Sequence, residues 1–175
     1  MVTIPDEVKD RVLSYIKHQA AKGAPALRDV VQRGHDQVIG LLAGMSDEQD
    51  GFKPSAEEWS VFEVLQHAAE AGRRTARGCV ALAAGGELNK IERVGQMKNE
   101  PFTSLDQARA ALDAAHQELL DFVDSLSPET NVEALLDHPF FGSLNCREWA
   151  AFQRVHDGDH AGQIEQITSA AGYPA

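Results

Sequence analysis

The chain has 175 residues and a mass of 19.0 kDa, which is enough for one domain with a hydrophobic core and hardly enough for two. Hydrophobic residues make up 43% of the chain and charged residues 25%, so we expect a folded globular protein and not a disordered one. A formal net charge of -11 and a pI near 5.0 argue against nucleic acid as a partner, because both surfaces would be negative.

Membrane association and export are not indicated either. The sequence has no run of about 18 apolar residues, and its first residues lack the basic and then apolar order of a signal peptide. The two cysteines, Cys79 and Cys146, are too sparse for a disulfide framework, so we expect a reducing, cytoplasmic location. The basic cluster of Arg73, Arg74 and Arg77 is interpreted as a solvated helix face.

The first part of the chain, residues 6–44, predicts two helices. Apolar residues recur here and later at three- and four-residue spacing, without sustained alternation, which is typical of an all-α protein. Gly23 can end a short leading helix, and Pro25 can occupy the first turn of the longer helix that follows.

A second main helix is predicted to begin near residue 61. Ser60 and Glu63 have the spacing of a capping box, and Trp59 and Val64 can pack together as a hydrophobic staple. The helix is expected to stop at the glycine pair that begins with Gly85.

A third main helix is predicted from Ser104, with Gln107 as its capping-box partner, to a point just before Pro128. The connection that precedes it, residues 86–103, is long enough to cross the length of a bundle. We therefore expect a four-helix bundle with a long crossover between helices two and three, plus the short leading helix.

The fourth main helix has the clearest start. Asn145 and Glu148 supply a capping box, and Leu144 and Trp149 supply a staple. Cys146 would lie in the first turn, where the helix dipole lowers the pKa of a thiol, although an inert buried thiol is the favoured interpretation.

Two histidines, His156 and His160, lie in the middle of the apolar stripe of this helix. Imidazoles four residues apart on a helix can reach one metal ion, although core histidines more often simply hydrogen-bond a neighbour. A metal site needs a third protein ligand, and His67 on the second main helix is the best placed.

The other histidines are assigned no role in the site. His18, His35 and His116 have charged or polar neighbours and are interpreted as surface residues. His138 precedes a proline in a connection, from which it can approach the end of the bundle.

Three segments resemble the DinB/YfiT-like family of metalloenzymes: "WSVFEVLQH" at 59–67, "HPFFGSLNCREW" at 138–149 and "HDGDHAGQ" at 156–163. The resemblance covers about residues 24–170 of a single domain that spans 1–175. It implies a four-helix bundle with a crossover connection and three histidines that bind a divalent metal, often zinc or nickel. These ligands carry over onto His67, His156 and His160.

One branch of the family often has a second histidine directly before the last ligand and a glutamine three residues after it. This chain keeps Gln163 but has Asp159 at the first of these places. Gly158, between the two ligands, is a further departure that weakens the helix by about 1 kcal/mol. Gln163 is expected to hydrogen-bond a substrate.

Three neutral imidazoles would leave a coordination position open, as in catalytic metal sites. Characterised relatives include transferases and isomerases that activate the thiol of mycothiol or bacillithiol. The resemblance therefore implies a low-molecular-weight-thiol-dependent S-transferase or isomerase that acts on a small-molecule substrate and forms a homodimer.

Three alternatives stay open: a metal-hydroxide hydrolase, a noncatalytic metal-stabilised binding or dimerisation module, and histidines that hydrogen-bond one another without metal. Glu63, Glu70 and Asp159 lie near the ligands in helical register, and none is assigned as a general base.

Overall fold

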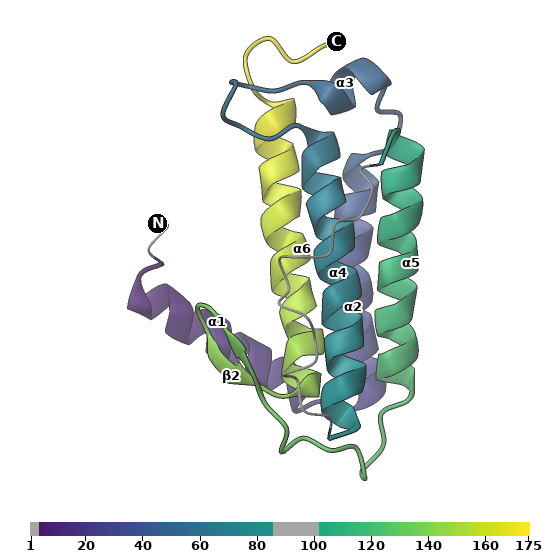
Figure 1. Cartoon of the computed structure of the whole chain (residues 1–175). Helices are drawn as coiled ribbons and strands as arrows, with labels where there is room; N and C mark the ends of the chain where they lie inside the picture. Colours follow the sequence, from purple (N-terminus) through teal and green to yellow (C-terminus); the bar gives the residue numbers. More distant parts are fainter. Residues whose placement is uncertain (1–3, 86–101) are drawn as a thin grey trace.

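The computed structural model describes residues 4–85 and 102–175 (Figure 1). Its elements in chain order are α1 (Asp6–Ala20), α2 (Ala24–Leu41), α3 (Asp47–Gly51), α4 (Val61–Ala83), α5 (Leu105–Asp124), β1 (Leu136–His138), β2 (Gly142–Leu144) and α6 (Cys146–Thr168). Helices α2, α4, α5 and α6 form a four-helix bundle, and α1 projects from its lower end as the expected leading helix. The predicted fold is confirmed.

The main helices run in two directions. In Figure 1, α4 and α5 both start at the end of the bundle near α3 and finish at the opposite end, whereas α2 and α6 run the other way. Parallel neighbours of this kind cannot be joined by a short hairpin loop. The predicted crossover falls on residues 86–101, which lie outside the described residues.

No helix of the described chain combines the length and the apolar character needed to cross a membrane.

The predicted helix starts depend on local hydrogen bonds, and two of the three capping boxes form as expected. The side chains of Ser60 and Asn145 accept hydrogen bonds from the backbone N–H groups of Glu63 and Glu148. In return, the carboxylates of Glu63 and Glu148 accept from the backbone N–H groups of Ser60 and Asn145. At α5, Ser104 caps the helix, but Gln107 Oε1 accepts from the Thr103 N–H at 3.0 Å. The third box is therefore incomplete.

Three short features differ from the prediction. Helix α2 stops at Leu41 instead of continuing to about residue 44, and Gly44 turns the chain with φ +75°. The short helix α3, of five residues, follows and is capped by Ser46. Strands β1 and β2 pair antiparallel within the connection that precedes α6, and three residues each are too few to produce a visible alternation of apolar side chains.

Two apolar clusters fill the bundle, one toward each end. The cluster near α1 includes Ile16, Leu27 and Leu119, and the cluster near α3 includes Val64 and Ile164. Between them the buried side chains are largely polar or very small. We call this the middle layer; its buried polar members are His35, Thr75, Gln153, Asp157 and His160. The candidate site lies in the same layer.

Candidate metal centre

Three histidines from two helices meet at the middle layer. His67 comes from α4, and His156 and His160 come from successive turns of α6. One ring nitrogen from each residue lies within 4.8 Å of the other two. The ring centroid of His67 is 5.5 Å from that of His156 and 5.0 Å from that of His160. The structure thus brings together the three residues that the sequence selected.

The spacing of the two α6 rings suits a shared ion. His156 Nε2 and His160 Nε2 are 3.2 Å apart. Two nitrogens bound at 2.0–2.1 Å to one tetrahedral ion would be about 3.3 Å apart. A hydrogen bond between the rings would have a similar length, so the positions of the ring protons decide between the two interpretations.

A neighbouring side chain favours a proton on the far nitrogen of His160. Gln163 Oε1 lies 3.1 Å from His160 Nδ1, and a carbonyl oxygen can only accept, so this nitrogen is the donor. His156 Nδ1 is buried and has no hydrogen-bond partner among the described residues, because Asp157 Oδ1 is 3.8 Å away, too far for a hydrogen bond. The Nε2 lone pair of His160 then faces His156 Nε2, and a shared cation would stabilise it.

Burial keeps the ring of His67 neutral. Its pKa is lowered to about 4, mainly by burial and then by the neighbouring charges of His160, His156 and Arg74. The pKa of His160 is also lowered, first by burial and then by His156. Metal binding requires the neutral imidazole, so these ligands need not lose a proton at neutral pH.

Gln163 was expected to contact a substrate, and the structure gives it a neighbour within the site. Its amide oxygen holds His160, while its side chain also lines a cavity of about 510 Å³ together with Trp59 and His160. Trp59, expected to staple onto Val64, has its ring centroid 5.3 Å from that of His67 and is 40% exposed. A substrate contact of Gln163 stays a prediction.

A second cavity, of about 310 Å³, is also lined by histidines of the cluster. His67 and His156 form part of its wall. The other lining residues are Ala71, Arg74, Thr75, Gly78, Leu136, His138, Pro139, Trp149 and Phe152. Each of the three histidines therefore lines one of the two cavities.

His138 enters this site although no helix positions it. It ends β1, and its ring centroid lies 4.5 Å from that of Phe152 and 4.7 Å from that of Phe141. Its pKa is lowered to about 4, mainly by burial and then by His156. His138 is not part of the three-nitrogen cluster.

The structure corrects the interpretation of His35 and His116 as surface residues. Their rings stack at 4.0 Å, with His35 Nε2 2.9 Å from Asp113 Oδ1 and His116 Nε2 3.3 Å from Gln32 Oε1. His35 is only 9% exposed. Polar neighbours in sequence were misleading, because each ring lies on the apolar stripe of its helix. Only His18 is exposed as expected.

One further expectation needs correction. Arg74 is not on a solvated face: it is half-buried, it lines the 310 Å³ cavity, and burial lowers its pKa.

The two cysteines are buried. Burial raises the pKa of the Cys146 thiol, and it raises the pKa of Cys79 as well. The inert interpretation of Cys146 fits this environment.

The structure does not single out a general base among Glu63, Glu70 and Asp159. Glu63 accepts from Ser60 N–H and Lys53 Nζ, and these hydrogen bonds lower its pKa. Asp159 is exposed, and Glu70 acts on the charge of Arg74. No general base is assigned.

Comparisons with known proteins agree with this arrangement. The family model described as the DinB superfamily matches residues 31–164. The uncharacterized protein YuaE of Bacillus subtilis (strain 168) is 32% identical over 142 residues, which cover 72% of this chain and 87% of YuaE. The crystal structure of TT2238, a four-helix bundle protein, superposes with a TM-score of 0.63 at 22% identity, covering 81% of this chain and 98% of that one. The family match includes all three histidines, and the chain belongs to the DinB superfamily.

Proposed function

We propose that this protein is a divalent-metal-dependent enzyme of the low-molecular-weight-thiol-dependent S-transferase or isomerase type. The observation that carries the proposal is the convergence of three imidazole nitrogens, within 4.8 Å of one another, beside two cavities. His67, His156 and His160 would hold the ion, which is zinc or nickel by the family resemblance.

The donor set fits such an ion. Three neutral nitrogen donors leave a divalent cation its full charge and an open position. When bound, the ion would supply Lewis acidity that lowers the pKa of a thiol or of water into the neutral range. Gln163 accepts from His160 Nδ1, so that Nε2 of this ring stays available for the ion.

The presence of two cavities favours a transferase, which binds two organic molecules, over a hydrolase. The 510 Å³ cavity reaches His160, and the 310 Å³ cavity reaches His67 and His156. A thiol in one cavity and an acceptor in the other would both lie next to the cluster. Hydrolysis needs only one organic substrate, so the metal-hydroxide hydrolase is the second candidate. A noncatalytic module would use the ion only to join α4 to α6.

The first experiment measures bound metal in the untagged protein, purified without chelator, beside the His156→Ala variant. We expect about one equivalent of a transition metal in the parent and little in the variant. No metal in the parent, even after reconstitution with zinc and with nickel, would refute the proposal.

A second experiment separates the candidate functions. The metal-loaded protein is incubated with an electrophile and mycothiol, bacillithiol or no thiol, and both thiol and electrophile are followed. Metal-dependent loss of both supports the transferase, and loss of an ester or amide substrate without thiol supports the hydrolase. Chelation that lowers stability, with no turnover of any substrate, supports the noncatalytic module.

The expected homodimer remains a proposal. Phe140, which the hairpin holds at 45% exposure, could contribute to an interface, whereas Phe141 packs against the core. Sedimentation of the parent and of Phe140→Ser tests this point without touching the histidines.

A further inference from the structure

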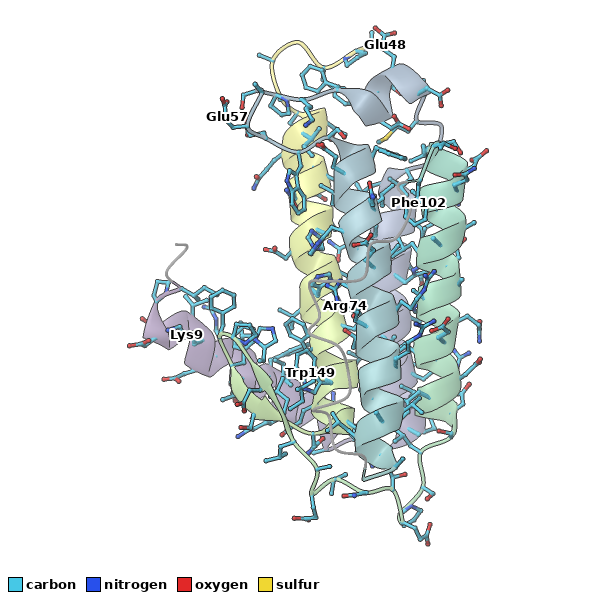
Figure 2. All side chains as sticks on the ribbon, in the orientation of Figure 1. Lys9, Glu48, Glu57, Arg74, Phe102 and Trp149 are labelled. Carbon is cyan, nitrogen blue, oxygen red and sulfur yellow. The ribbon has the colours of Figure 1, made fainter. Side chains whose placement is uncertain are left out.

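The 310 Å³ cavity contains a cation that the three-histidine site does not require. Arg74 lies on α4 about two turns after His67, and it lines the cavity that His67 and His156 also line. Figure 2 shows Arg74 midway along α4 and Trp149 lower down, near the start of α6. The cation and the histidine cluster therefore face the same space.

Arg74 is incompletely partnered by the part of the chain that the structure describes. Its Nε atom is buried and has no hydrogen-bond partner among the described residues. Glu70, one turn earlier, is the acidic residue that acts on its charge, and it does not line the cavity. A buried donor on a charged group is costly unless an acceptor reaches it. Because Arg74 is cationic and its Nε lacks an acceptor among the described residues, an anionic ligand would complement it best.

The remaining wall of the cavity defines what else that ligand must be. Trp149, Phe152, Leu136 and Pro139 present apolar and aromatic surface, and no Asp or Glu is among the described lining residues. Aromatic surface of this kind binds flat, apolar groups well. A single guanidinium matches the planar fork of one carboxylate, whereas a phosphate dianion usually recruits a second cation or several N–H groups.

We propose that Arg74 binds the carboxylate of a small aromatic or apolar acid whose body lies against Trp149 and Phe152. The histidine cluster then lies beside the same molecule. The role of this acid as a substrate rests on the proposed function, whereas its binding does not.

The test uses the full chain, first prepared without metal, so that a carboxylate has no ion to bind. Benzoate and the neutral benzamide are titrated separately, and the indole N–H resonance of Trp149 and the Nε–H resonance of Arg74 are followed by NMR. Benzoate is expected to bind at least about tenfold more tightly than benzamide, the gain of a charge-assisted hydrogen-bonded pair.

Matched variants assign this preference to Arg74. Arg74→Gln should remove the preference for benzoate, and Arg74→Lys, which keeps the charge and loses the fork, should keep only part of it. Arg77→Gln removes the same charge from the same helix but outside this cavity, and should behave like the parent.

The outcomes separate this inference from the proposed function. An unchanged preference in Arg74→Gln overturns the inference whatever the metal content. If Arg74→Gln fails to fold, the parent decides, because saturating benzoate must shift the Arg74 Nε–H resonance. If the parent binds no metal yet shows the preference, the acid site stands and the proposed enzyme fails. Equal binding of zinc by Arg74→Gln and the parent shows that the two sites are separate.

Discussion

Two groups of histidines share the middle layer of the bundle, and their surroundings differ. The rings of His35 and His116 stack face to face, 4° from parallel, and each has an oxygen acceptor on a neighbouring residue. In the cluster of His67, His156 and His160 the rings are tilted or edge-on, and the nitrogens face one another.

This contrast separates the proposed ligands from the structural histidines. Both groups are largely buried, and both join different helices, so neither burial nor location separates them. The difference lies in the hydrogen-bond partners. Asp113 and Gln32 pair directly with the stacked rings, whereas Gln163 pairs with His160 on the side away from the cluster and leaves the near nitrogen of that ring facing its neighbours. Substitutions in the two groups should therefore have different consequences.

The largest expected effect separates the two groups by metal affinity. His156→Ala should weaken zinc binding by more than about a hundredfold, because loss of a ligand exceeds the effect of losing an outer partner. His35→Ala should retain about one equivalent. Competition with a chromogenic chelator measures both. Equal loss of metal in the two variants would contradict the distinction drawn here.

The next effect concerns the outer partner of His160. Gln163→Ala removes the acceptor at His160 Nδ1 and should weaken zinc binding about 10- to 100-fold, without abolishing it. Gln166→Ala, on the same helix, is the matched control and should bind zinc like the parent. Affinity that does not change in Gln163→Ala would assign this residue to the substrate, as the sequence suggested.

A smaller effect is expected on stability from the stacked pair. His116→Ala removes the stack on His35 and the hydrogen bond to Gln32, and should lower the free energy of unfolding by about 1–3 kcal/mol. His18→Ala, on the exposed side of α1, should change it by less than about 0.5 kcal/mol. Urea unfolding of the metal-free proteins gives both values. Equal values for the two variants would show that the stack adds no stability.

The last effect is the share of the pH dependence that belongs to His116. Its pKa is lowered from an ordinary 6.5 to about 4, mainly by burial and then by His35, against the opposing charges of Asp157, Asp36 and Asp113. The folded state thus binds fewer protons than the unfolded state, so the contribution is complete above pH 6.5 and is lost as the pH falls toward 4.

The variant His116→Gln should therefore lose less stability than the parent over this pH range, measured by unfolding of both proteins without metal. His67 and His138, whose pKa values are also about 4, will leave a remaining slope in the variant. Identical slopes in parent and variant would show that His116 does not titrate in this window.

The sequence predicted best where a structure depends on neighbours in the chain. The caps at Ser60 and Asn145 involve residues three positions apart, and so does the incomplete one at Ser104, where Gln107 reaches one residue further back. His156 and His160 were recognisable for the same reason. The match of His67 to them came from the family resemblance and from its register on α4.

Residues whose role depends on another helix were harder to predict. His35 follows Val31 by one turn, and His116 follows Leu112 by one turn, so both lie on apolar stripes, but nearby charges suggested the surface. Arg74 was judged in the same way from its arginine neighbours. The stack of two rings and the cavity at Arg74 arise only when α2 meets α5 and when α4 meets the hairpin and α6.

The polar middle layer also fixes how far each helix can slide along its neighbours. Apolar side chains tolerate a shift of one helical turn, about 5.4 Å, because the apolar surface of one turn resembles that of the next. The same shift would place Gln153 and Asp157, which hydrogen-bond each other at 2.7 Å, among the aliphatic side chains of one end. Gly34 lets α2 approach α6 closely at this level, since a methyl group there would lie 2.9 Å from Asp157 Oδ2. The middle layer thus fixes the register of the helices along the bundle axis and selects a single alignment.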